Sequence, residues 1–201
     1  MLVVICAVFA GAAQDKLRRV EQPAKYIYSN TPIEVVVNID GKEMPSREIM
    51  AGSDWLKRVT LEITNTSGKD INWLWINLML REPKYGATER KPENAGIAIP
   101  VELRHTDVKV LRAEERIMLK PPVNMVEHWT KYAREQGMED IEKVILDIHQ
   151  VGFTDDTAWT NGRFSRKDPE SGRYLFITEK PEYLNSIFIP KIDLLFFDIR
   201  P

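Results

Sequence analysis

The strongest constraint on the fold of this chain is a series of short segments in which apolar and polar side chains alternate. The apolar members are Ile33, Val35, Val37 and Ile39 in the first segment, Val59, Leu61 and Ile63 in the second, and Val144, Leu146 and Ile148 in the third. A period of two is typical of a strand with one buried and one exposed face. The sequence therefore predicts a domain that is built mainly from short β-strands.

The clearest unit covers residues 59–80. Its alternating first part, 59–64, is followed at 65–70 by a cluster of residues that favour turns. A second apolar run, 71–80, begins directly after this cluster. A strand, a short polar turn and a second strand together predict a β-hairpin.

The remaining elements are expected from shorter patterns. Strands are predicted at 97–104, 108–112, 116–120, 173–178 and 187–199, and irregular or loop segments at 14–32, 81–96 and 154–172. Only residues 123–136 have a helical pattern, because Val126, Trp129, Tyr132 and Ala133 recur at spacings of three and four. Seven to nine strands with one inserted α-helix favour an all-β sandwich over alternating βαβ units. We therefore expect residues 14–201 to form a single β-sandwich domain.

The first 13 residues differ in character from the rest of the chain. Residues 2–13 (LVVICAVFAGAA) are apolar or small and carry no charge. The segment is too short to span a bilayer, and the small residues at 10–13 fit a cleavage site, so 1–13 is predicted to be signal-peptide-like. No basic residue follows Met1, which leaves open a start further upstream. The alternative is a buried N-terminal strand.

Cysteine content and charge are consistent with export. The single cysteine, Cys6, lies in the signal-peptide-like segment, so the mature chain would contain no thiol. Neither a cysteine nucleophile nor a cysteine metal site is then expected. The net charge of −2 does not suggest nucleic-acid binding, which usually requires a strongly basic face. We expect an exported protein, periplasmic or extracellular, with no membrane span in the mature chain.

Two segments resemble known sequences. VTLEITNTSGKDI, at 59–71, resembles the early hairpin of immunoglobulin-like domains in exported bacterial proteins. VGFTDDTAWTNGRFSRKDP, at 151–169, is similar to a segment of uncharacterised exported bacterial proteins, although Thr157 stands where a glycine is more usual. The resemblance implies an immunoglobulin-like β-sandwich and export. It implies no activity and no functional residues.

No catalytic signature is present. The segment around Ser53 lacks the second glycine of a G-x-S-x-G nucleophile elbow. The three histidines, His105, His128 and His149, lie on separate predicted elements and have no metal-binding spacing. His149 is expected to point away from the apolar face of residues 144–148. No catalytic residue is therefore predicted.

The best candidate for a metal site is the acidic segment 154–172. Asp155, Asp156 and Asp168 could supply oxygen ligands to calcium, the only cofactor that the sequence suggests. Their spacing matches no known calcium loop, and aspartate is common in turns because it bonds locally to the backbone. A purely structural turn is therefore the favoured interpretation.

Five tryptophans, at 55, 73, 75, 129 and 159, are the other candidates for ligand binding. If the leucines of 71–80 face the core, Trp73 and Trp75 lie on the opposite face. The helix at 123–136 could cover them, which burial of apolar area favours, or they could form a platform for sugar rings. A third alternative is a register bulge that places Trp75 in the core. Trp159, in a polar segment, is expected to be exposed and is the ligand-binding candidate.

These observations lead to three hypotheses about function. The leading one is an exported, non-enzymatic β-sandwich protein that binds an unknown protein or glycan partner, or has a structural or accessory role. The first alternative is a carbohydrate-binding module that uses exposed tryptophans. The second is a hydrolase with carboxylates on the 81–96 and 154–172 loops.

Overall fold

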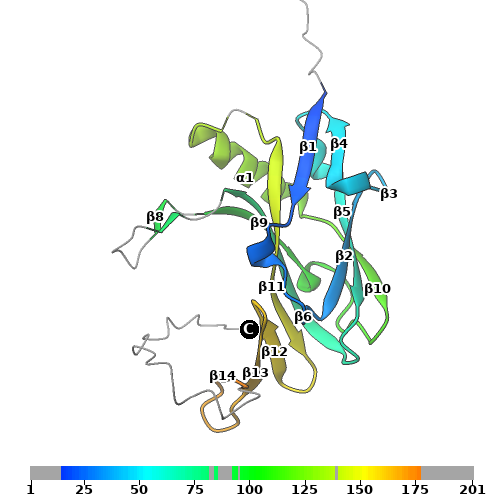
Figure 1. The fold of residues 1–201 in the computed structure, drawn as a ribbon, viewed down its shortest axis with the longest axis vertical. Coiled ribbons are helices and arrows are strands. Elements are labelled where there is room, and N and C mark those ends of the chain that lie inside the picture. The colour runs from blue at the N-terminus through cyan, green and yellow to red at the C-terminus, as the bar shows by residue number, and fades with distance from the viewer. Residues whose placement is uncertain (1–14, 82–83, 86–91, 95, 139, 178–201) are drawn as a thin grey trace, which may run out of the picture.

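The computed structural model describes residues 15–81, 84–85, 92–94, 96–138 and 140–177 (Figure 1). The chain is mostly β, with two main sheets that enclose a common core and one α-helix. The all-β class that the sequence predicts is therefore confirmed.

We call the larger sheet sheet A and the four-stranded one sheet B. Sheet A contains β1 (Lys16–Glu21), β4 (Glu48–Ala51), β6 (Ile71–Arg81), β9 (Ile97–Glu102), β11 (Lys143–Phe153), β12 (Thr157–Thr160), β13 (Arg163–Lys167) and β14 (Tyr174–Phe176). Sheet B contains β2 (Ile33–Ile39), β3 (Lys42–Glu43), β5 (Val59–Asn65) and β10 (Arg116–Leu119). A separate pair is formed by β7 (Lys84–Tyr85) and β8 (Pro92–Asn94). Short 3₁₀ turns are η1 (Ala24–Tyr26), η2 (Pro45–Arg47), η3 (Trp55–Lys57) and η4 (Leu103–His105).

The central strand of sheet A is β11. It pairs with β6 along most of its length, and β6 in turn pairs with β9. The opposite edge of β11 is shared by two strands, because β1 pairs in parallel with its start and β12 pairs antiparallel with its end. From there β13 and β14 extend the sheet beyond β12, and β4 extends it beyond β1.

The hydrophobic core lies between sheets A and B. Val37 of β2 and Leu61 of β5 come from sheet B, and Leu78 of β6 and Leu146 of β11 come from sheet A; all four are at most 2% exposed. The alternating segments therefore bury their apolar members, as the period of two predicts.

The prediction of a hairpin over residues 59–80 is wrong. Strand β5 belongs to sheet B and β6 to sheet A, so the chain crosses from one sheet to the other between them. Asn65, which is fully buried, stabilises this crossing: its Nδ2 donates to the carbonyl oxygens of Lys69 (2.7 Å) and Leu111 (3.0 Å). Its Oδ1 accepts from the backbone N–H of Ser67 (3.0 Å). These bonds hold a turn that leads away from sheet B instead of back along it.

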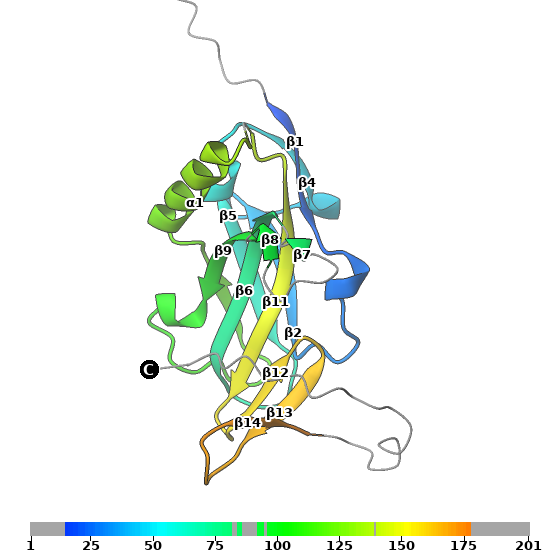
Figure 2. The ribbon, with the colours of Figure 1, turned by 90° about the vertical axis from the view of Figure 1, so that its left-hand side faces the viewer.

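Helix α1 (Val123–Glu135) forms close to where the sequence predicts a helix, but it does not cover Trp73 and Trp75. It contacts β9 and η3, and its buried residues, Val126 and Ala133, belong to the core between the sheets. Figure 2 shows α1 beside the β9 edge, at one end of the sandwich. The prediction that this helix covers the tryptophans is therefore wrong, because Val126 and Ala133 bury the apolar stripe of the helix in the core instead.

Several boundaries differ from the sequence predictions. Strand β1 lies within the expected lead-in 14–32, and the expected loop 154–172 contains β12 and β13. Residues 108–112 contribute a single bridge, between Leu111 and Ile71. The segments 1–13 and 187–199 and most of 81–96 lie outside the described residues. Among the residues that are described, no helix is long and apolar enough to cross a bilayer.

Candidate functional site

The outer face of β9, β6 and β11 carries a group of aromatic and polar side chains, which we call the tryptophan face. Its members are Trp73, Trp75, Asn77, Glu102, Arg104, Asp147 and His149. On β6 the leucines point into the core and Trp73, Trp75 and Asn77 point outward and are half-buried, as the alternation predicts. The indole Nε1 of Trp75 donates to Oδ1 of Asn77 (2.8 Å).

Two irregularities in the pairing of β6 with β11 shape this face. A bulge in β11 leaves His149 without a pairing partner on β6. Its neighbours Ile148 and Gln150 pair with Ile76 and Trp75. The His149 ring meets the Trp75 ring edge to face, with centroids 4.5 Å apart, which confirms that His149 points away from the core. Further along β11, a Cβ on Gly152 would lie 2.9 Å from Cβ of Trp73, so the backbone accommodates Trp73 only because this residue is glycine.

Asp147 is the most unusual member of the tryptophan face. It is 5% exposed, although it points to the outer side of β11 beside Asn77. Its Oδ2 accepts from Nδ2 of Asn77 (3.2 Å) and lies 3.7 Å from Nδ1 of His149. Its Oδ1 is buried and has no hydrogen-bond partner in the described part of the chain. A buried carboxylate oxygen without a donor is costly, so Asp147 is held in place at the expense of stability.

Glu102 is the second buried carboxylate. It is 5% exposed and stands opposite Trp75 in the pairing of β9 with β6. Arg104 contacts both of its oxygens, donating from Nη2 to Oε1 (3.1 Å) and forming an ion pair from Nε to Oε2. The same guanidinium lies 5.5 Å from the ring centroid of Trp73. Arg104 thereby neutralises Glu102 and stacks on Trp73, which fixes one border of the tryptophan face.

The chemistry of the tryptophan face suits a ligand with both apolar C–H faces and hydroxyl donors. The two indoles offer half-exposed ring surface. Polar groups border these rings: Asn77 is half-buried next to Trp75, and the exposed Arg104 lies over Trp73. Ligand sites commonly combine apolar lining with a few oriented polar groups, and this face has that composition.

Trp159 is not exposed, and this expectation from the sequence is wrong. It is 0% exposed in β12, where its ring meets that of Tyr28 edge to face at 5.6 Å. The segment was expected to be a polar loop, but Asn161 and Gly162, both with positive φ, form a two-residue turn between β12 and β13. An Asn-Gly pair is a strong hairpin signal that should have identified these strands.

Two of the three aspartates of the calcium hypothesis have their carboxylates engaged elsewhere. Asp155 accepts from Nζ of Lys69 (2.7 Å), and Asp168 accepts from Oγ of Ser171 (2.6 Å) within its own turn. Asp156 has a positive φ of 59° and bonds through its backbone carbonyl to the N–H of Lys167. In the described ranges, no group of three or more histidine, cysteine or acidic side chains is arranged to hold a metal ion.

Adding calcium or EDTA is therefore expected to leave the melting temperature of the protein unchanged. Burial would raise the pKa of Asp155, but hydrogen bonds from Lys69 and Thr157 outweigh it and lower the pKa to about 2. The carboxylate is thus already ionised and paired at neutral pH, so calcium would have to displace Lys69. Differential scanning calorimetry measures the midpoint, and a rise that calcium causes and EDTA reverses would restore the metal hypothesis.

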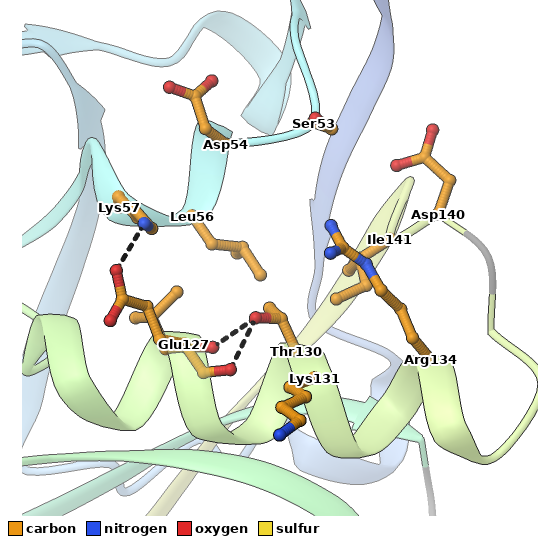
Figure 3. Close-up of a pocket in the computed structure, with 11 residues that line it drawn as sticks. Ser53, Asp54, Leu56, Lys57, Glu127, Thr130, Lys131, Arg134, Asp140 and Ile141 are labelled. Atoms are coloured by element: carbon orange, nitrogen blue, oxygen red, sulfur yellow. Dashed lines mark hydrogen bonds and ion pairs between the residues drawn. The ribbon is translucent and has the colours of Figure 1, made fainter.

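A small hollow lies between η3 and α1 (Figure 3). Its volume is about 230 Å³, and Lys57 and Glu127 point toward each other in it and form an ion pair of 2.7 Å. Thr130 donates its hydroxyl proton to the helix backbone, and Asp140 is paired with Arg18 (2.8 Å). Because these groups already satisfy one another, the hollow has less to offer a ligand than the tryptophan face.

The remaining polar candidates are not brought together. Ser53 and Asp54 directly precede η3. His128 is on α1, where its ring meets the ring of Trp129 with centroids 5.2 Å apart. His105 lies 3.7 Å from Oε2 of Glu102, at the border of the tryptophan face. The described residues thus hold no serine–histidine arrangement of the kind that nucleophilic catalysis requires.

The fold and the site together define a two-sheet β protein with an aromatic and acidic surface on its larger sheet. No protein-family model matches the chain, and comparisons with curated proteins and with solved structures find no match either.

Proposed function

We propose that this protein is a non-enzymatic β-sandwich binding module that recognises carbohydrate on the tryptophan face. The observation that carries this proposal is the pair of half-exposed indoles, Trp73 and Trp75, on one face of β6, with the carboxylates of Asp147 and Glu102 beside them. Sugars present hydroxyl donors at the rim of an apolar C–H face, which matches an acceptor placed next to an indole. Trp75, instead of Trp159, is the residue on which the sugar stacks.

We further propose that the domain is immunoglobulin-like and exported, as the sequence analysis suggests. The change of sheet between β5 and β6 supports the first part, because such sandwiches connect their two sheets by strands that cross. The apolar segment 2–13, followed by a chain without cysteine, supports the second. An outer location would also place the protein where polysaccharides occur.

Carbohydrate binding can be tested with a glycan array followed by calorimetric titration of the full chain. Trp75→Ala is expected to weaken binding of the glycan that is found by at least about tenfold, because it removes the stacking surface. Asp147→Asn keeps the size of the side chain but changes its acceptors, and we expect it to weaken binding as well. Tyr132→Ala is the matched control, because Tyr132 is an exposed aromatic residue on α1, away from this face.

Two results would contradict the proposal. One is an array without any glycan signal, and the other is binding that Trp75→Ala leaves intact. Circular dichroism of each variant separates a loss of affinity from a loss of the fold.

Hydrolysis is the second candidate function, because the two buried carboxylates lie on the same face. Neighbouring strands are about 4.8 Å apart, and Glu102 and Asp147 stand opposite Trp75 and Asn77, two residues apart along β6, so the backbones of the two acidic residues are about 12 Å apart. Glycosidases hold their carboxyl groups about 5 Å or 6.5–9.5 Å apart. Turnover of an oligosaccharide that is abolished by both Glu102→Gln and Asp147→Asn would replace the binding proposal with this one.

A further inference from the structure

Strand β14 is an exposed apolar edge of sheet A. Tyr174, Leu175, Phe176 and Ile177 are between 42% and 55% exposed, which is unusual for four consecutive large apolar side chains. Side chains of adjacent residues in a strand point to opposite faces, so both faces of β14 are apolar and uncovered by the described residues. Exposed apolar edges promote association with another strand.

One edge of β14 is paired and the other is open. Phe176 pairs with Ser165 and Leu175 with Arg166 of β13, and the N–H of Ile177 donates to the carbonyl of Phe164 (2.8 Å). Arg163 stacks over the ring of Phe176 at 5.5 Å. Within the described chain, β14 is the last strand in the sheet order and has β13 as its only partner. Its outer backbone groups are thus available to a further strand.

The chain continues beyond β14 with a segment that the sequence predicts to be a strand. Twenty-four residues, 178–201, follow Ile177, and 187–199 (IFIPKIDLLFFDI) is an apolar run that the sequence analysis predicts to be a strand. The nine residues 178–186 between them include Pro181, Asn185 and Ser186, which favour turns. Such a connection spans up to about 30 Å, far more than the roughly 4.8 Å to a neighbouring strand.

We propose that residues 187–199 pair with β14 as the next strand of sheet A and cover its exposed side chains. Pro190 and the charged residues Lys191, Asp193 and Asp198 fit a final edge strand, where proline is tolerated and charge discourages further pairing. A segment tied by a short linker has an effective concentration in the millimolar range. It therefore outcompetes the same segment of a second copy at micromolar protein concentration.

Hydrogen exchange of the full chain, followed by mass spectrometry, tests this proposal. We expect amides of 174–177 and 187–199 to exchange at least about tenfold more slowly than in the variant Leu194→Asp/Phe196→Asp, which places charge on one face of the segment. The matched control is Lys191→Asp/Asp193→Lys, which exchanges two charges and keeps every apolar residue; it should retain the protection. Unchanged protection of β6 and β11 in all variants shows that the sandwich is intact.

Light scattering at protein concentrations of about 1 and 100 µM measures the oligomeric state. It shows whether the strand that pairs with β14 comes from the same chain or from a second copy. Protection that is independent of concentration, in a monomer, is the expected result. Protection that rises together with a dimer overturns the proposal in favour of a second copy. Equal, rapid exchange of 187–199 in the parent chain and in Leu194→Asp/Phe196→Asp overturns it outright.

Discussion

Replacing Trp159 with alanine is expected to lower the free energy of unfolding by about 3–5 kcal/mol, the range for large aromatic residues in a core. Trp159 is 0% exposed and joins the β12–β13 hairpin to the segment before β2. Its ring packs on Tyr28, and its Nε1 donates to Oδ1 of Asn30 (3.3 Å). Asn30 in turn donates to the carbonyl of Gly162 (2.8 Å) in the hairpin turn. Alanine would remove the ring, so Tyr28 would lose its aromatic contact and Asn30 would lose its hydrogen bond from the indole.

Urea denaturation followed by circular dichroism measures this loss. Trp75→Ala removes the same side chain from a half-exposed position and should cost clearly less, so it is the matched control. Trp159→Phe should recover part of the stability, because it refills much of the volume without the hydrogen bond. A loss for Trp159→Ala no larger than that for Trp75→Ala would contradict the burial on which the argument depends.

The burial of Trp159 also shows where sequence patterns are informative and where they are not. Residues 33–39 form β2 with the bounds that their alternation predicts, because one face of that strand packs on the core and the other does not. At 154–172 the polar composition outweighed the Asn161-Gly162 signal, and two strands were missed. Composition describes the average of a segment, whereas a turn depends on two residues.

The prediction of a hairpin at 59–80 is wrong for a different reason. A strand, a turn and a strand look alike in sequence whether the second strand returns beside the first or crosses to the other sheet. The difference lies in the partners of Asn65, and one of them, Leu111, is 46 residues away. Local patterns contain no information about such a contact.

The candidate site was predictable only in part. The alternation of β6 identified Trp73 and Trp75 as a pair on the face opposite the leucines. It could not identify Glu102 or Asp147, because these residues come from strands far apart in the sequence. They meet the tryptophans only through the pairing of β9 and β11 with β6.

Replacing Arg18 with alanine is also expected to cost about 3 kcal/mol of unfolding free energy, because a buried guanidinium loses three hydrogen bonds worth about 1 kcal/mol or more each. Arg18 is 1% exposed, and its guanidinium joins three elements. Its Nε donates to the carbonyl of Ala51 (3.0 Å) in β4, and its Nη1 donates to Oδ1 of Asp140 (2.8 Å) and to the carbonyl of Ile141 (3.1 Å). Removing it leaves these acceptors with fewer donors and opens a cavity.

Two variants separate the roles of charge and geometry at this position. Arg18→Lys keeps the charge but lacks the planar set of donors that reaches Ala51 and Asp140 together, so it should recover only part of the stability. Lys16→Ala removes the exposed partner of Asp140 (3.1 Å) and should cost no more than about 1 kcal/mol. Equal losses for Lys16→Ala and Arg18→Ala would contradict a special role of the buried guanidinium.

The dependence of stability on pH provides an independent test of the same pair. Burial alone would raise the pKa of Asp140, but the hydrogen bonds from Arg18 and Lys16 outweigh it and hold the pKa below its usual value of 3.8. A carboxyl group with a lowered folded-state pKa stabilises the protein fully above its unfolded pKa, and this stability is lost as the pH falls through the folded value. We therefore expect the free energy of unfolding to decrease below about pH 4, and to decrease less steeply in Asp140→Asn. Urea titrations between about pH 2.5 and 6 compare the two slopes, and parallel curves would show that Asp140 does not respond to Arg18 in this way.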